Sequence, residues 1–167
     1  MVTCRDSRFH WNELSNYLLI HERQVQACVD EGFVVSDELH AVITRDRQKR
    51  SATVALKGRL TCVHDVFLDT EVRLEVMERG GSTWVRLGDG KYHAGIAGDA
   101  PRTIFRYDTA HPYPEHEENY HKHHFNHATW EEVGTPEWIG RKHRPHLGEV
   151  LEELQVWWRN TGQLLIR

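Results

Sequence analysis

The spacing of hydrophobic residues changes twice along this chain of 167 residues. Over residues 11–31 they lie mostly three or four positions apart, which predicts an amphipathic helix that ends near Gly32. From Thr53 they alternate with polar residues, as in half-buried antiparallel strands. From Leu147 to Trp158 a stripe with helical spacing returns, and it predicts a closing amphipathic helix after Pro145.

One segment gives conflicting signals. Ser36-Asp37-Glu38 resembles a helix start, because Ser and Asp are common N-caps. The β-branched run Val42-Ile43-Thr44 is less favourable in a helix. We interpret residues 36–47 as helical.

The alternating region predicts an antiparallel meander. Four or five strands are expected over residues 53–62, 71–76, 84–87, 92–96 and 103–108, with turns at 78–82, 88–90 and 98–101. The closing helix should pack across one face of this sheet. The expected fold is therefore α+β: an antiparallel four- to five-stranded sheet, a C-terminal amphipathic helix and an N-terminal helical extension. Residues 1–50 form the helical region and residues 51–167 the α+β domain, in one compact unit.

Composition restricts the classes of partner. Hydrophobic residues make up 39% of the chain and there are six Trp, which favours a packed core over disorder. A net charge of −4 is a poor match to a protein that clamps duplex nucleic acid.

Cys4, Cys28 and Cys62 are odd in number and form no C-x-x-C pair, so we expect reduced thiols. The sequence shows no apolar run of membrane-spanning length and no signal-peptide core. We therefore expect a cytoplasmic protein that does not associate with a membrane.

Histidines concentrate in one part of the sequence. Eight of the thirteen lie between His111 and His146, and six of those fall within residues 111–127. Imidazole titrates near neutral pH and is the commonest metal ligand. The region from residue 104 to residue 127 is therefore the candidate site for an acid–base, metal or anion-binding function.

The expected strand over residues 104–108 brings other functional groups to this region. Alternation places Arg106 and Asp108 on one side and Phe105 and Tyr107 on the other. A simple ion pair between Arg106 and Asp108 is one interpretation. The other is functional, because His111 follows three residues after Asp108, and a carboxylate beside an imidazole can fix its tautomer and support its charged form.

A second segment, residues 120–127, can supply two more imidazoles. If it is extended, His121 and His123 face the same way. We predict that it pairs with residues 104–108, so that Arg106, Asp108, His121 and His123 point into one cleft. The alternative is an exposed loop with solvated histidines.

Two chemistries fit these residues. In a metal-independent ribonuclease that needs no cofactor, histidines take the ribose proton and protonate the leaving oxygen, while cations hold the phosphate. The candidates are His111, His121 and His123 for proton transfer, Asp108 to orient a histidine, Arg106 and Lys122 to bind phosphate, and Tyr107 to assist. In a metal-binding module, Asp108, His111, His121 and His123 would hold a divalent transition metal such as zinc, although no H-E-x-x-H spacing occurs.

Several short motifs resemble a known family. The run from Phe105 to His111, the segment His121-Lys122-His123 and the run Arg144-Pro145-His146-Leu147 before the final helix are similar to the TumE-type toxins of toxin–antitoxin pairs. Thr109 stands where that family frequently has Asn. The resemblance implies a growth-inhibiting toxin bound by a cognate antitoxin, and by analogy with other small toxins it suggests a ribonuclease with an RNA substrate. A non-catalytic subunit of a larger complex is a further alternative.

Overall fold

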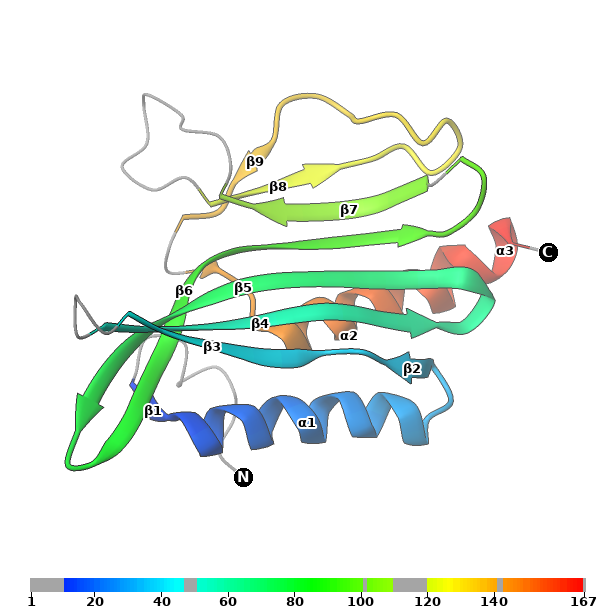
Figure 1. Ribbon diagram of the computed structural model, residues 1–167. Coiled ribbons are helices and arrows are strands. Elements are labelled where there is room, and N and C mark those ends of the chain that lie inside the picture. Colours follow the sequence, from blue (N-terminus) through cyan, green and yellow to red (C-terminus); the bar gives the residue numbers. More distant parts are fainter. Residues whose placement is uncertain (1–10, 47–50, 101, 110–119, 141–142, 167) are drawn as a thin grey trace.

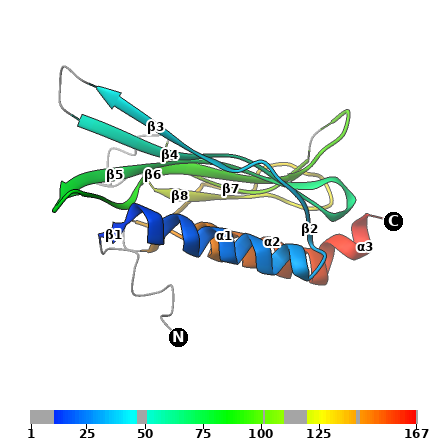
Figure 2. The same ribbon diagram turned by 60° about the horizontal axis from the view of Figure 1, so that its bottom comes forward.

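A single antiparallel sheet dominates the computed structural model, which describes residues 11–46, 51–100, 102–109, 120–140 and 143–166. These residues form nine strands, so the prediction of four or five strands is wrong. Two helices lie side by side across one face of the sheet, and the other face carries no helix in the described part of the chain (Figure 1, Figure 2). The expected closing helix and the expected N-terminal helix are both confirmed.

The sheet has the strand order β2-β4-β5-β6-β7-β8-β9, with β1 paired to β6 and β3 paired to β4. Its strands are β1 (Asn12–Glu13), β2 (Val34–Asp37), β3 (His40–Asp46), β4 (Ser51–Cys62), β5 (Val66–Arg79), β6 (Ser82–Ile96), β7 (Arg102–Asp108), β8 (His121–His124) and β9 (Glu137–Trp138). The helices are α1 (Leu14–Asp30), α2 (Leu147–Trp157) and the short α3 (Gln163–Leu165), which a π-helical turn (Trp158–Gly162) joins to α2.

The segment that we interpreted as a helix, residues 36–47, is extended wherever it is described. It contributes the end of β2 and all of β3, and both strands pair with β4. The β-branched residues Val42, Ile43 and Thr44 fit this backbone better than a helix. The connection between β2 and β3 passes over Gly58. A Cβ atom at this position would collide with the Glu38 carbonyl oxygen. Gly58 has a φ of +134°, a conformation that glycine tolerates.

The expected turn at residues 88–90 is a β-bulge, and β6 continues through it. Val72 pairs with Gly90 while Leu74 pairs with Leu87, so two residues of β6 oppose one residue of β5. The buried guanidinium of Arg144 donates to the carbonyl oxygens of Gly88 and Leu87 and so ties the bulge to the segment before α2. Glycine and aspartate in a strand can therefore mark a bulge as well as a reversal.

The hydrophobic core lies between the sheet and the two helices. Four core residues of α2 are at most 1% exposed: Leu147, Val150, Leu151 and Leu154. Burial of such side chains contributes roughly 1.5–3 kcal/mol each. The sheet residues buried on this side include Leu56, Leu60, Leu68, Val72, Leu74, Tyr92 and Ala94. Packing on this helix-covered face therefore stabilises the sheet.

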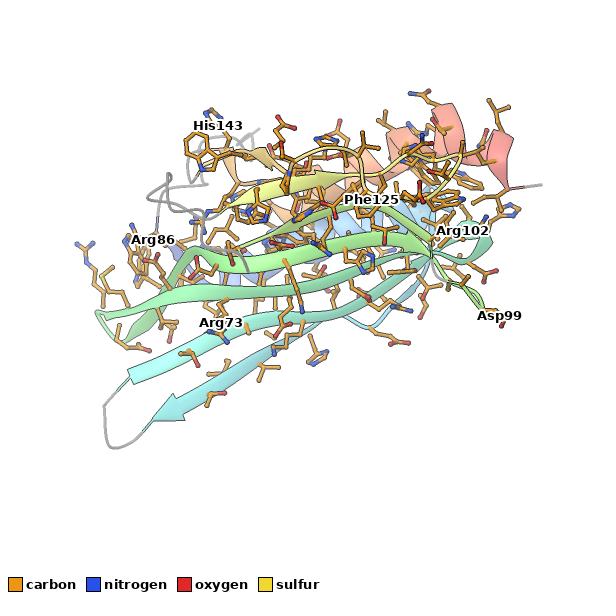
Figure 3. The ribbon with its side chains drawn as sticks, turned by 90° about the horizontal axis from the view of Figure 1, so that it is seen from above. Arg73, Arg86, Asp99, Arg102, Phe125 and His143 are labelled. Atoms are coloured by element: carbon orange, nitrogen blue, oxygen red, sulfur yellow. The ribbon has the colours of Figure 1, made fainter. Side chains whose placement is uncertain are left out.

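The opposite, open face is polar. Its side chains form rows because residues in direct register point the same way. One row crosses five strands from β4 to β8 and consists of Arg59, Asp69, His93, Arg106 and His123. Figure 3 shows the side chains along the sheet, with Arg86 toward one end and Arg102, at the start of β7, toward the other. The candidate site lies on this open face.

Candidate metal centre

The candidate site is formed by two paired strands, β7 and β8. Arg106 is in register with His123 and Asp108 with His121, so the predicted pairing of the two segments is confirmed. Because each strand contributes residues two positions apart, all four side chains share the open face. Pairing in this register brings the two imidazoles to the carboxylate and the guanidinium.

Asp108 lies at the centre of the cluster. Its Oδ1 is 3.0 Å from Nε2 of His121, and its Oδ2 is 3.3 Å from Nε2 of His123. The centroids of the two imidazole rings are 4.8 Å apart. One potential ligand atom from each residue lies within 4.8 Å of the other two. Such a group of one carboxylate oxygen and two imidazole nitrogens can hold a metal ion.

The three residues are deeply buried. Asp108 is 4% exposed, His121 1% and His123 3%. Burial of an ionised carboxylate is unfavourable unless partners compensate its charge. Here the compensation comes from the adjacent Arg106 and from the two imidazoles.

Arg106 connects this cluster to the surface. Its Nε donates to Oδ2 of Asp108 at 2.7 Å, and one terminal nitrogen lies 3.1 Å from Nε2 and 3.3 Å from Nδ1 of His123. Its side chain is 34% exposed, whereas that of Asp108 is 5% exposed. The expected ion pair between Arg106 and Asp108 is thus present, and it is part of a larger network.

Glu132 joins the cluster from the loop after β8, and our sequence analysis did not identify it. Its Oε1 is 2.5 Å from Nδ1 of His123. The backbone of Glu132 bridges to Phe125, and the loop between them is closed by a hydrogen bond from Trp130 N–H to the Asn126 carbonyl. In the sequence Glu132 follows another glutamate and belongs to no motif, so the sequence carries no signal for this contact.

Two residues predicted for the site lie on the other face of the sheet. Tyr107 and Lys122 point toward α2, where both bind Glu153, with the Tyr107 hydroxyl and the Lys122 ammonium each 2.6 Å from a carboxylate oxygen. Burial and the neighbouring Glu153 raise the pKa of Tyr107 well above its usual range. The structure therefore brings together Arg106, Asp108, His121 and His123 but not Tyr107 or Lys122. His111 lies outside the described residues.

A groove of about 680 Å³ adjoins the cluster on the open face, and Arg106 and Asp108 line one side of it. Three other cations of the groove are paired with acids on neighbouring strands. The distances are 2.8 Å for Lys57–Glu71, 2.7 Å for Arg59–Asp69 and 3.1 Å for Lys91–Glu71. The two lysines lower the pKa of Glu71 to about 2.

His93 also lines the groove, between Asp69 and Arg106 in the row of registered side chains. Burial lowers its pKa, and the nearby cations, Arg106 among them, add to this effect against the opposing influence of Asp69. A neutral imidazole in a charge-balanced groove gives this surface little attraction for a long polyanion.

Comparisons with known proteins identify no relative, since no family model, curated protein or solved structure matches the chain.

Among the described residues, no helix combines the length and the apolar character that crossing a membrane requires.

Proposed function

We propose that this chain is a metal-binding protein whose centre, formed by Asp108, His121 and His123, holds a divalent transition metal such as zinc. The observation that carries the proposal is the convergence of three potential ligand atoms within 4.8 Å of one another. Zinc accepts imidazole nitrogen and carboxylate oxygen at about 2.0–2.2 Å, and four-coordinate ligands then lie roughly 3.3 Å apart. Oδ1 of Asp108 is 3.0 Å from Nε2 of His121 and Oδ2 is 3.3 Å from Nε2 of His123, so each carboxylate oxygen lies near that separation from one imidazole nitrogen.

The residues around the three ligands support the same proposal. Metal-binding histidines usually donate their second ring N–H to a carboxylate, which fixes the tautomer and strengthens the ligand. Glu132 is placed for this role, because it contacts Nδ1 of His123 while Nε2 faces Asp108. Three protein ligands leave at least one coordination position open, as in catalytic rather than purely structural zinc sites.

A metal-independent ribonuclease of the toxin type is the second candidate function. Arg106 favours it, because a guanidinium beside two imidazoles is suited to hold a phosphate next to proton-transfer groups. In that case RNA would be the substrate and a cognate antitoxin the protein partner. Two features favour the metal proposal instead. The imidazoles are almost fully buried, and the groove beside them has balanced charge.

The metal proposal is tested by elemental analysis of untagged protein dialysed against zinc-free buffer after loading. We expect close to one zinc ion per chain in the wild type, and loss of this ion in Asp108→Asn, His121→Ala and His123→Ala. His124→Ala is the matched control, because His124 lies on the same strand but is 46% exposed and pairs with Glu137. Equal zinc content in His124→Ala and His121→Ala would contradict the proposal.

A second assay separates the two candidates. Purified protein is incubated with a mixed RNA substrate in the presence and absence of a chelator. Cleavage that persists in chelator and disappears in His123→Ala would support the toxin ribonuclease. Co-expression of a neighbouring gene that relieves growth inhibition would identify the antitoxin partner.

A further inference from the structure

We propose that Arg106 is the group that binds an oxyanion beside the metal, so that the ligand of this centre is a small molecule with a phosphoryl or carboxyl group. The inference rests on the proposed metal site and adds the chemical class of its ligand. It assigns Arg106 a binding role toward the ligand, beyond its ion pair with Asp108.

Arg106 lies between the buried ligands and the groove. Asp108, His121 and His123 have side chains that are at most 5% exposed, whereas that of Arg106 is 34% exposed. Arg106 also lines the groove. A ligand that approaches the metal through this groove therefore meets the Arg106 guanidinium.

The charge of the metal-loaded centre favours an anionic ligand. Asp108 and Glu132 each contribute one negative charge, Arg106 contributes one positive charge, and a divalent metal contributes two. With neutral imidazoles, the metal-loaded centre therefore carries one uncompensated positive charge. In a buried environment such a charge is best neutralised by an anionic ligand.

Arg106 differs from the other cations of the groove in its partners. Lys57, Arg59 and Lys91 are held by Glu71 or Asp69, which are not among the three ligands of the centre. Arg106 is held by Asp108 and also contacts His123, and both are among those ligands. A metal on Asp108 weakens this carboxylate as a partner for Arg106 and repels the guanidinium. Metal binding thus makes Arg106 available to a ligand while the other three cations stay paired.

The groove restricts the size and charge of the ligand. A volume of about 680 Å³ lies within the range of small-molecule sites. A guanidinium binds phosphate and carboxylate with two parallel hydrogen bonds, which gives orientation as well as affinity. The paired cations of the groove leave no continuous positive track for a longer polyanion. A small oxyanion that bridges the metal and Arg106 fits these features.

The test uses Co²⁺ as a spectroscopic probe in the full chain. Its visible absorption reports ligand exchange at the metal, so titration with inorganic phosphate, and separately with acetate, measures anion binding. We expect Arg106→Gln to bind Co²⁺ at least as tightly as wild type, because a competing cation is removed. We expect it to bind the anion about tenfold more weakly or worse, since a charge-assisted hydrogen bond is lost.

Arg86→Gln is the matched control. Arg86 is 35% exposed and its Nε donates to Glu75 at 2.6 Å, so it reproduces the cross-strand ion pair without lining the groove. We expect this variant to bind both Co²⁺ and anions like wild type. Arg106→Lys keeps the charge without the planar pair of donors, and it should recover part of the anion affinity.

The outcomes separate the two proposals. Equal anion affinity in wild type and Arg106→Gln, with Co²⁺ bound in both, would overturn the role of Arg106 and leave the metal site intact. Absence of stoichiometric Co²⁺ in folded wild-type protein would overturn the metal site and the inference with it. The relative affinities for phosphate and acetate identify which oxyanion the centre prefers.

Discussion

Two buried groups of histidines, one on each side of the sheet, differ in the residues that contact them. On the open face, His121 and His123 lie against Asp108, with Arg106 and Glu132 beside them. On the helix-covered side, His21 of α1 lies 6.1 Å from His146, measured between ring centroids, and 4.4 Å from the Tyr17 ring. The first group contains acids, which can stabilise a cation or a charged imidazole, whereas the rings of Tyr17 and His146 lie beside His21.

This difference shows that burial alone does not define a functional histidine. Burial, with a smaller contribution from His146, lowers the pKa of His21 to about 3. His21 therefore stays neutral and serves as a packing residue at neutral pH. Near His121 and His123, the carboxylates create a site in which a metal ion can replace protons. Four changes test this contrast, from the largest expected effect to the smallest.

Removal of the central acid should have the largest effect. Asp108→Ala leaves Arg106 without its carboxylate and removes the acid that lies against both imidazoles. We expect the free energy of unfolding to fall by about 3 kcal/mol, as for a broken buried ion pair. Urea unfolding of metal-free protein measures the change. Asp99→Ala, in an exposed turn, is the control and should change stability by less than about 0.5 kcal/mol. Similar stability of the two variants would contradict the central role of Asp108.

Acidification should destabilise the protein through His21. Its pKa is about 3 in the folded chain and near 6.5 without burial. Stability from the neutral imidazole is therefore complete above pH 6.5 and is lost as the pH falls from 6.5 toward 3. Between pH 6.5 and pH 5 the loss amounts to about 2 kcal/mol. Urea unfolding of wild type and His21→Leu over this range should show the steeper decline in wild type, and parallel curves would exclude His21 as the cause.

Removal of the outer carboxylate should weaken metal binding without abolishing it. Glu132→Gln keeps the shape of the side chain but reduces its ability to accept from Nδ1 of His123. We expect zinc affinity to fall by about tenfold, as for other partners of metal-binding histidines. Competition with a chromophoric chelator measures the affinity. Glu131→Gln, at the adjacent exposed position, is the control, and an equal loss in both variants would assign the effect to general surface charge.

Loss of the acid on the helix-covered side should affect stability only. Glu153→Gln weakens the contacts to Tyr107 and Lys122. We expect a loss of about 0.5–1 kcal/mol in the free energy of unfolding, because Glu153 is partly exposed. Zinc content should remain that of wild type. Loss of zinc in this variant would mean that Tyr107 or Lys122 supports the metal centre.

The sequence predicted the local pattern at the site better than the extent of the sheet. Alternation along two short segments placed Arg106 and Asp108, and likewise His121 and His123, on common sides, whereas the pairing of the two segments was a hypothesis about the site. The pattern also separated Tyr107 and Lys122 from these residues, although we assigned both to the site from their chemistry. The direction of a side chain predicted its place better than its chemistry did, because the strand geometry determines the face on which each side chain lies.

The features that sequence analysis missed depend on contacts distant in the chain. The segment over residues 36–47 looked helical because Ser36, Asp37 and Glu38 form an apparent cap, and pairing of β2 and β3 with β4 overrides that local preference. The bulge at Gly88 was interpreted as a turn because the β5 partner that continues across it cannot be seen locally. Glu132 reaches His123 only through the fold of a polar loop.

X-ray absorption spectroscopy of the zinc-loaded protein tests the central claim most directly. The account predicts a first coordination shell of nitrogen and oxygen only, at about 2.0–2.2 Å, with the outer-shell signature of two imidazoles. The same spectrum should be absent from His121→Ala after dialysis and present in His124→Ala. A sulfur shell at about 2.3 Å, which would assign the ion to a cysteine, or an unchanged spectrum in His121→Ala would contradict a centre built on Asp108, His121 and His123.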